Sequence, residues 1–179
     1  MRYNQIRECD IANGEGIGVA LFVQGCHFHC KNCFNTETWD FYGGKEWTPE
    51  IKEEFLKLID KPYIKRISIL GGEPLANENL DDVLNLVRMI YRLYPDKKLW
   101  IYTGYNIEDI FHSYRKHLDE DYVSWHKREK IISYCDVMVD GRYIDEERDI
   151  TLKWRGSKNQ RVIDIQKTFV NGDVVLWTS

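Results

Sequence analysis

Alternating apolar and polar stretches along the chain predict a succession of strands and helices. Residues 80–94 carry apolar side chains at three- and four-residue steps, which predicts a helix with Asn79 as N-cap and Pro95 as its stop. A second helical stripe follows Thr48-Pro49, a pair typical of an N-cap and a proline at the first helical position. Short β-branched and apolar runs predict buried strands at residues 19–25, 66–70, 99–103 and 136–141.

This order of elements predicts an α/β fold. Strands that alternate with helices pair in parallel, because each connection must cross over the sheet. The carboxyl ends of parallel strands then lie along one edge, where such folds place their chemistry. The residues directly after the predicted strands are Cys26, Gly71–Pro74, Thr103-Gly104 and Asp140. We therefore expect them to converge on one site.

The length of 179 residues fits one domain with its own core. Residues 168–176 are mostly apolar around Asn171-Gly172, a pair that favours a hairpin turn. We expect residues 1–179 to form a single domain, with residues 165–179 as a C-terminal hairpin extension without a catalytic role.

Composition and charge exclude several classes of function. The net charge is −4 and the two signs are interleaved, which argues against a nucleic-acid partner. No run approaches the roughly 20 apolar residues of a membrane helix. The first five residues are polar, unlike a secretory signal. We expect a cytoplasmic protein with neither a membrane nor a nucleic acid as partner.

Three of the five cysteines, Cys26, Cys30 and Cys33, fall within eight positions and indicate a metal or cluster site. A disulfide framework would be dispersed and even in number. A closed iron–sulfur cluster takes four thiolates. Three thiolates leave one iron open, much as catalytic zinc sites keep an open position. An open iron can chelate the amino and carboxylate groups of S-adenosylmethionine (SAM).

The same loop allows two non-catalytic interpretations. In the first, His27 or His29 is the fourth ligand of a zinc site, although a paired second half such as another Cys-x2-Cys is absent. In the second, Cys9 or Cys135 completes a closed electron-transfer cluster. Otherwise we expect Cys9 and Cys135 to be ordinary buried thiols.

The Cys-x3-Cys-x2-Cys loop after one strand and the Gly-Gly-Glu-Pro turn after the next resemble the radical SAM superfamily. The resemblance implies a single-domain partial (βα) barrel with a curved, mainly parallel sheet. It implies that Cys26, Cys30 and Cys33 hold one 4Fe–4S cluster per chain and that the open iron binds SAM. One electron then breaks a carbon–sulfur bond, giving methionine and a 5′-deoxyadenosyl radical.

The resemblance also assigns residues to SAM binding. Glycines let the backbone approach closely, and Glu73 can pair with the SAM ammonium group. The position before the third cysteine, often aromatic in the superfamily, is Asn32, so Phe28 and Phe34 are candidates for the packing near adenine. The full set implied to bind SAM is Phe28, Asn32, Cys33, Phe34, Gly71, Gly72, Glu73, Pro74, Thr103, Asp140 and Arg142.

Three polar segments can each be interpreted in more than one way. Asp140-Gly141-Arg142 resembles an Asp-x-Lys arrangement of related activases. Asp140 could hold a cation or orient SAM and Arg142 could meet the SAM carboxylate, or both could form plain salt bridges. Residues 155–161 could bind the SAM carboxylate or a partner's glycine loop, or form a hydrogen-bonded turn. Residues 13–16 could line the SAM or partner side, or form a turn.

The order and spacing of segments between residues 10 and 161 resemble the activating proteins of anaerobic (class III) ribonucleoside-triphosphate reductases. This resemblance implies an enzyme that cleaves SAM and leaves a glycyl radical on the large reductase subunit. The cluster and SAM would carry the radical chemistry, while the protein binds and orients them. The implied partners are that large subunit and an electron donor such as flavodoxin or ferredoxin. Alternatives are another glycyl-radical enzyme as target, or a small molecule such as a deazapurine precursor.

Overall fold

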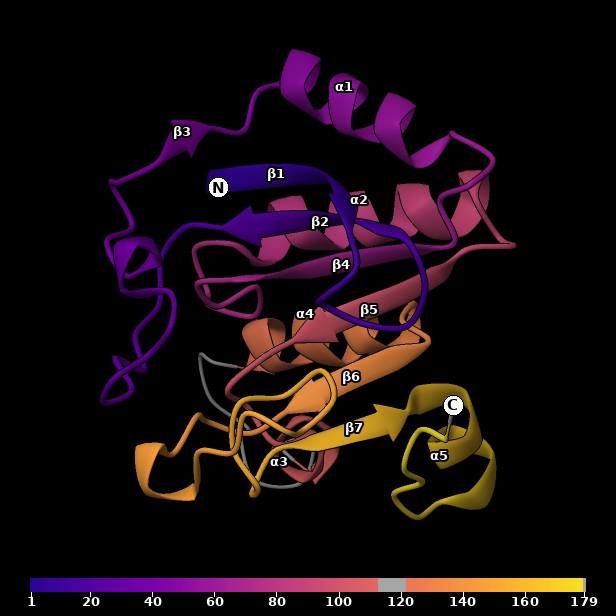
Figure 1. The fold of residues 1–179 in the computed structure, drawn as a ribbon. Coiled ribbons are helices and arrows are strands. Elements are labelled where there is room, and N and C mark those ends of the chain that lie inside the picture. Colours follow the sequence, from indigo (N-terminus) through magenta and orange to yellow (C-terminus); the bar gives the residue numbers. More distant parts are fainter. Residues whose placement is uncertain (113–121, 179) are drawn as a thin grey trace.

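The computed structural model describes residues 1–112 and 122–178. Its strands form one seven-stranded sheet in the order β3-β1-β2-β4-β5-β6-β7 (Figure 1). The strands are β1 (Arg2–Asp10), β2 (Gly18–Val23), β3 (Lys45–Glu46), β4 (Arg66–Gly71), β5 (Lys98–Tyr102), β6 (Val137–Asp140) and β7 (Arg161–Asp164). The described helices are α1 (Pro49–Ile59), α2 (Leu80–Leu93), α3 (Ile107–His112), α4 (Tyr122–Ser133) and α5 (Ile165–Asn171).

The centre of the sheet is parallel and its edges are antiparallel. β2, β4, β5 and β6 pair in parallel, which confirms the predicted α/β class. β1 pairs antiparallel with β2 and β3, and β7 pairs antiparallel with β6. The expected mainly parallel sheet is therefore corrected to a mixed one, because only three of the six pairings among the described strands are parallel. Residues 11–17 between β1 and β2 are too few for a crossover, so these strands must run antiparallel. The finer assignment to a partial barrel stays a prediction.

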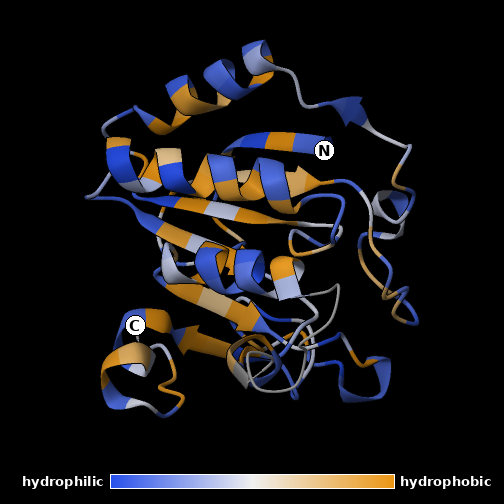
Figure 2. Ribbon diagram, turned by 180° about the vertical axis from the view of Figure 1, so that it is seen from behind, coloured by the Kyte–Doolittle hydropathy of each residue, from blue (hydrophilic) through white to orange (hydrophobic). Residues whose placement is uncertain are grey.

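Helices α2 and α4 cover one face of the sheet, as Figure 2 shows from behind. Their buried residues, among them Leu86, Ile90 and Ile131, join the main apolar core with buried residues of the strands. The opposite face carries two smaller clusters of buried apolar residues, one around Phe22 and one around Trp100. No described helix is long and apolar enough to cross a membrane.

The two predicted helix starts are confirmed, but only one of the two N-cap side chains makes the expected capping hydrogen bond. The Thr48 hydroxyl accepts a hydrogen bond from the N–H of Ile51, and Pro49 begins α1. Asn79 takes the N-cap position of α2, but its side chain makes no capping bond. Its amide instead donates to the carbonyl oxygens of Gln24 and Glu73, each at 3.0 Å. The start of α2 is thereby tied to the ends of β2 and β4.

The predicted C-terminal hairpin around Asn171-Gly172 is wrong, because residues 165–171 form helix α5. Asp164 caps this helix by accepting a hydrogen bond from the N–H of Lys167. Gly172 ends it in the left-handed conformation, with φ at 78°. A glycine with positive φ serves a helix end and a hairpin turn equally well, so the Asn-Gly pair did not distinguish them. Beyond α5 the chain returns to β7, where Leu176 bridges Ile163 in antiparallel fashion.

Candidate functional site

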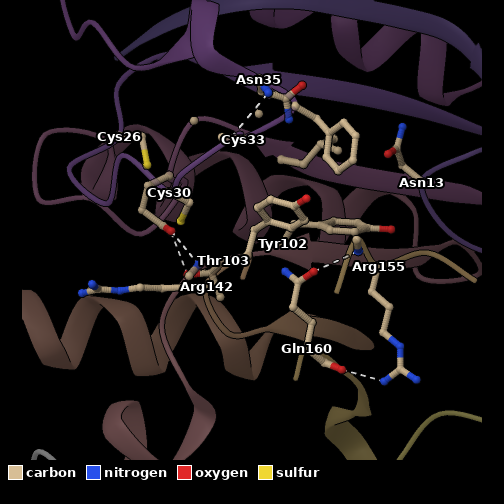
Figure 3. Close-up of a pocket in the computed structure, with 18 of the residues that line it drawn as sticks. Asn13, Cys26, Cys30, Cys33, Asn35, Tyr102, Thr103, Arg142, Arg155 and Gln160 are labelled. Carbon is tan, nitrogen blue, oxygen red and sulfur yellow. Dashed lines mark hydrogen bonds between the residues drawn. The ribbon is translucent and has the colours of Figure 1, made fainter. Parts of the chain in front are cut away.

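A cavity of about 450 Å³ opens where the central parallel strands end. In Figure 3, Cys26, Cys30, Cys33 and Arg142 lie at one side of it, and Asn13, Arg155 and Gln160 lie at the other. The structure therefore brings together most of the residues singled out from the sequence. Those that line the cavity are Cys26, Phe28, Cys30, Cys33, Phe34, Gly71, Gly72, Glu73, Thr103 and Arg142.

The cysteine loop begins at the carboxyl end of β2 and is fixed by backbone hydrogen bonds. The N–H of Gly25 donates to the carbonyl oxygen of Thr38 at 2.8 Å, and that of Cys26 donates to Trp39 at 3.0 Å. Gly25 has a φ of 94°, and a Cβ there would lie 2.0 Å from the ring of Phe41. Only glycine fits this position, which turns the chain out of the sheet into the loop.

The three thiols at this end of the cavity fit the donor set of an iron–sulfur cluster. The backbone N–H of Asn35 donates to Cys33 Sγ at 3.5 Å. Burial raises the pKa of the Cys26 thiol to about 11 and also raises the pKa of Cys30. Ligation requires thiolates, so a bound cluster must displace these protons. Among the described residues, no group of three or more His, Cys, Asp or Glu side chains is arranged to hold a single metal ion. A four-iron cluster instead spreads its cysteine ligands over separate irons.

The alternative ligands considered from the sequence have other surroundings. His27 Nε2 lies 2.9 Å from Glu78 Oε1, and the His29 ring stacks on Trp39. Cys135 is buried, as expected, and does not line the cavity. Cys9 is exposed, so the expectation that it is buried is wrong. It lies in the stretch of β1 where the pairing with β2 shifts register, and there the strand leaves the core.

Glu73 is 2% exposed and joins the ends of two strands. Its Oε1 accepts hydrogen bonds from Thr103 Oγ1 at 2.7 Å and from the N–H of Leu75 at 2.8 Å, and Oε2 accepts from the N–H of Gly104 at 2.8 Å. Burial raises the pKa of Glu73 to about 7, although all three hydrogen bonds favour the carboxylate. The side chain thus holds the turn after β4 against the turn after β5.

Close packing around Phe28 fixes the floor of the cysteine loop. A Cβ on Gly104 would lie 2.4 Å from the Phe28 ring, so this position also requires glycine. The Phe28 ring meets Tyr105 edge-on at 5.0 Å, and the Arg142 guanidinium lies 4.3 Å from the Phe28 centroid. The loop and the end of β5 therefore pack as one unit, with the arginine beside them.

Asn32, Pro74 and Asp140 are not part of the cavity wall in the part of the chain that the structure describes. Asn32 has a φ of 55°, and its amide donates to Asp145 Oδ2 at 2.7 Å on the surface. Pro74 is buried behind the turn that Glu73 holds. These positions support the wall rather than form it.

Asp140 forms a buried ion pair, which was one of the alternatives left open for it. Its carboxylate accepts from Arg161 Nη2 at 2.5 Å and from the N–H of Ile107, at the start of α3, at 3.0 Å. Arg161 in turn makes a two-pronged pair with Glu108 at 2.8 and 2.7 Å. The pKa of Arg161 is raised by these two carboxylates. The partner of Asp140 is thus Arg161, whereas Arg142 lies on the Phe28 ring in the cavity wall.

Residues 155–161 form a hydrogen-bonded turn that also lines the cavity. Gln160 Oε1 accepts from the N–H groups of Gly156 at 2.9 Å and Ser157 at 3.2 Å. Arg155 Nη1 donates to the carbonyl oxygen of Gln160 at 2.6 Å, as drawn in Figure 3. Arg155, Gly156 and Gln160 are all in the cavity wall. The hydrogen-bonded turn is therefore confirmed, whereas binding of the SAM carboxylate or of a partner's glycine loop stays a prediction.

A buried ion pair holds residues 10–16 over the sheet. Arg66 Nη2 lies 2.9 Å from Asp10 Oδ1, and Arg66 Nη1 donates to the carbonyl oxygen of Asn13 at 2.5 Å. Asp10 Oδ1 also accepts from the N–H of Asn13 at 2.9 Å. This segment forms a turn, and Asn13 faces the cavity from it.

Several other residues of the cavity wall could not be predicted from the local sequence pattern. Trp39 and Tyr102 lay next to motifs, but nothing in the pattern showed which way they point. The segment after β6 contributes side chains through tertiary packing alone, which no local pattern reveals. The cavity residues missed in this way include Arg7, Trp39, Tyr102, Tyr143, Ile150, Leu152 and Trp154.

Comparisons with known proteins show to which family the chain belongs. Residues 12–163 match the family model described as a 4Fe-4S single cluster domain. The chain is 35% identical over 164 residues to the anaerobic ribonucleoside-triphosphate reductase-activating protein of Enterobacteria phage T4, covering 90% of this chain and 93% of that protein. Identity is 36% over 162 residues to the protein of the same name from Vibrio cholerae serotype O1, covering 89% and 96% of the two chains. It is 33% over 164 residues to that from Escherichia coli K12, covering 90% and 97%. The chain therefore belongs to the family of anaerobic ribonucleoside-triphosphate reductase-activating proteins, enzymes of the activase kind with a 4Fe–4S domain.

Proposed function

We propose that this chain is a radical SAM activase that generates a glycyl radical on the large subunit of an anaerobic ribonucleoside-triphosphate reductase. One observation carries the proposal: Cys26, Cys30 and Cys33 share a single cavity with the Gly71-Gly72-Glu73 turn at the carboxyl ends of parallel strands. The name of the relatives supports the anaerobic reductase as the target and partner. A cytoplasmic location is part of the same proposal.

In this proposal Cys26, Cys30 and Cys33 would hold one 4Fe–4S cluster and leave a position open for SAM. The cluster and SAM would supply the one-electron chemistry that removes a hydrogen atom from a glycine of the reductase. The protein's own share is to hold the loop rigid. The hydrogen bonds from Gly25 and Cys26 to residues 38 and 39 serve this purpose.

The cavity wall offers complementary groups for the amino-acid end of SAM. Arg142 carries the positive charge that a carboxylate requires, and it lies beside the cysteine loop on Phe28. The Gly71–Glu73 turn supplies backbone groups and a carboxylate for the ammonium. Among the described residues, Oε2 of Glu73 accepts a hydrogen bond from the N–H of Gly104 alone, which leaves acceptor capacity on that oxygen.

Aromatic side chains near the cysteines suit the adenine ring. Phe34 is 60% exposed and lies 5.3 Å from the ring of Tyr143, and both line the cavity. A planar base can stack on such a surface. Asn32, Pro74 and Asp140 keep indirect roles in this proposal, because they hold the loop, the turn and the start of α3.

The rim of the cavity is suited to a protein substrate. Ile150 is 85% exposed although it contributes to the wall. A reductase loop seated here would cover this apolar side chain and exclude water from the radical. An electron donor such as flavodoxin or ferredoxin would approach the exposed side of the cysteine loop, around His27 and Lys31.

The test is anaerobic reconstitution with iron and sulfide, reduction with dithionite, and addition of SAM and the reductase large subunit. We expect 5′-deoxyadenosine and, by electron paramagnetic resonance, a glycyl radical on the reductase. Cys26→Ala, Cys30→Ala and Cys33→Ala should abolish both products, whereas Cys9→Ala should abolish neither. Formation of 5′-deoxyadenosine without a glycyl radical on the reductase would indicate that the enzyme acts on another substrate. A loaded cluster that yields neither product would refute the proposal.

A further inference from the structure

The indole of Trp39 presents a buried hydrogen-bond donor without an acceptor. Its Nε1–H is inaccessible to solvent and has no hydrogen-bond partner among the residues that the structure describes. Buried donors are almost always paired, because leaving one unpaired loses the hydrogen bond it would make to water. An acceptor therefore has to come from something that binds beside this side chain.

The position of Trp39 limits what that acceptor can be. Trp39 lines the cavity together with Cys26, Cys30 and Cys33. Its carbonyl oxygen accepts the N–H of Cys26 at 3.0 Å, and its ring stacks on His29 with centroids 4.6 Å apart and planes inclined by 23°. The backbone and the ring of Trp39 are thus both fixed to the segment that carries the cysteines. The Trp39 side chain is therefore held next to that segment before any cluster binds.

The loop already directs N–H groups toward sulfur. The backbone N–H of Asn35 donates to Cys33 Sγ, and backbone N–H groups of Phe28 and His29 lower the pKa of Cys26 against the effect of burial. A cluster bound here would bring four sulfide ions as well as the three thiolates. Such sulfur atoms would be acceptors in the cavity whose wall contains Trp39.

We propose that Trp39 Nε1–H donates a hydrogen bond to a sulfur of the cluster and thereby raises the reduction potential of the cluster. The inference rests on the cluster-binding part of the proposed function but not on the identity of the substrate. A hydrogen bond to sulfur stabilises the more negative, reduced cluster more than the oxidised one. Trp39 is a positioning residue in this sense, because it acts through the cluster and does not touch the reacting glycine.

The test is the substitution Trp39→Phe, which keeps an aromatic ring against His29 but removes the N–H. Wild type and variant are reconstituted without SAM and titrated anaerobically with dithionite, and the reduced cluster is followed by electron paramagnetic resonance. We expect equal iron and sulfide content but a more negative midpoint potential in the variant. At a fixed potential the ratio of reduced to oxidised cluster should fall about tenfold, which corresponds to about 59 mV for one electron.

Trp47→Phe is the matched control, because Trp47 packs on Tyr3 and Phe55 away from the cavity. Its midpoint potential should equal that of the wild type. A Trp39→Phe protein with a full cluster and an unchanged potential would overturn the inference. Failure of the wild type to bind a cluster would instead refute the proposed function, so the two failures are distinguishable.

A second measurement covers the case in which Trp39→Phe does not load its cluster. Wild-type protein labelled with [15N]tryptophan is examined by pulsed electron paramagnetic resonance of the reduced cluster. We expect a 15N coupling that persists in Trp154→Phe, which removes the other tryptophan of the cavity wall. No coupling, or a coupling lost with Trp154, would overturn the inference.

Discussion

At the scale of single residues, Glu73 combines two demands that oppose each other. Its carboxylate accepts three hydrogen bonds that join the turns after β4 and β5, which favours the charged form. Its burial favours the neutral form and is the larger effect, so the pKa rises to about 7. The side chain that holds the site together therefore titrates near neutral pH.

This pKa makes the stability of the cluster-free protein depend on pH. The folded chain binds the Glu73 proton more tightly than the unfolded chain, whose pKa is near 4.5. The contribution of this group is therefore fully favourable below about pH 4.5 and is lost as the pH rises to about 7. The loss is on the order of 3 kcal/mol. In urea unfolding at pH 5 and pH 8, Glu73→Gln should lose less stability than the wild type over that interval. The exposed control Glu53→Gln should follow the wild type, and an identical loss in Glu73→Gln would contradict the prediction.

A second residue-scale prediction concerns Gly104. A Cβ at this position would lie 2.4 Å from the Phe28 ring, so Gly104→Ala must displace the floor of the cysteine loop. Such overpacking costs about 1–3 kcal/mol. We expect lower iron content after reconstitution and a lower unfolding midpoint. The double variant Gly104→Ala/Phe28→Leu should recover part of the stability, because the smaller side chain relieves the contact. A double variant whose loss equals the sum of the two single losses would show that Phe28 is not the cause.

At the scale of elements, the link between β1 and β2 depends on one arginine of β4. Arg66 is fully buried and reaches both Asp10 and the carbonyl oxygens of the connecting loop. A Cβ on Gly14 would lie 2.4 Å from the Arg66 side chain, so the loop closes tightly over it. Asn13, which faces the cavity, is placed by this arrangement.

Removing Arg66 should therefore be costly. Arg66→Met removes the buried guanidinium 2.9 Å from the Asp10 carboxylate and leaves only Arg7, at 3.8 Å and partly exposed, as a counter-ion. Breaking a buried ion pair in this way typically destabilises a protein by about 3–5 kcal/mol. We expect this loss in chemical unfolding, together with weaker SAM binding because the carbonyl oxygen of Asn13 loses the hydrogen bond from Arg66. Asp10→Asn/Arg66→Met should lose less than Arg66→Met alone, since no unpaired charge remains. A double variant as unstable as the single one would show that the packing of the arginine, rather than its charge, matters.

The strands and helices that could be predicted from the sequence are those with a clear periodicity of apolar residues or a clear boundary residue. β2 and β4 are almost wholly buried, and α2 carries a regular apolar stripe, so their local patterns carried enough information. β1 was missed because it lies toward the edge and is largely half-buried or exposed, which leaves no alternation to detect. The cysteines were found by spacing, whereas Trp39 and residues 143–154 reach the cavity only through packing between distant segments.

At the scale of the whole molecule, the cavity wall has two parts of different character: the side with the cysteines and the segment after β6. The cysteine side is closed by the loop and by the turns after β4 and β5. The segment after β6 forms another part of the wall and carries exposed apolar side chains, with Ile150 foremost. A large protein substrate would have to contact this segment in order to bring its glycine near SAM. Cleavage of SAM and transfer to the partner should therefore depend on different residues.

This separation predicts a specific defect for Ile150→Asp. The side chain is 85% exposed, so the charge costs the free protein little, but it would lie unpaired in the reductase interface proposed for the cavity rim. A penalty of about 1.4 kcal/mol lowers affinity about tenfold. We expect Ile150→Asp to form 5′-deoxyadenosine as the wild type does when the reductase is absent. Its affinity for the large subunit should be about tenfold lower. The yield of glycyl radical at limiting reductase should fall to match. Val170→Asp, at an 86% exposed position on α5, is the matched control and should change neither quantity. Equal binding of the reductase by Ile150→Asp and wild type would place the docking surface elsewhere on the molecule.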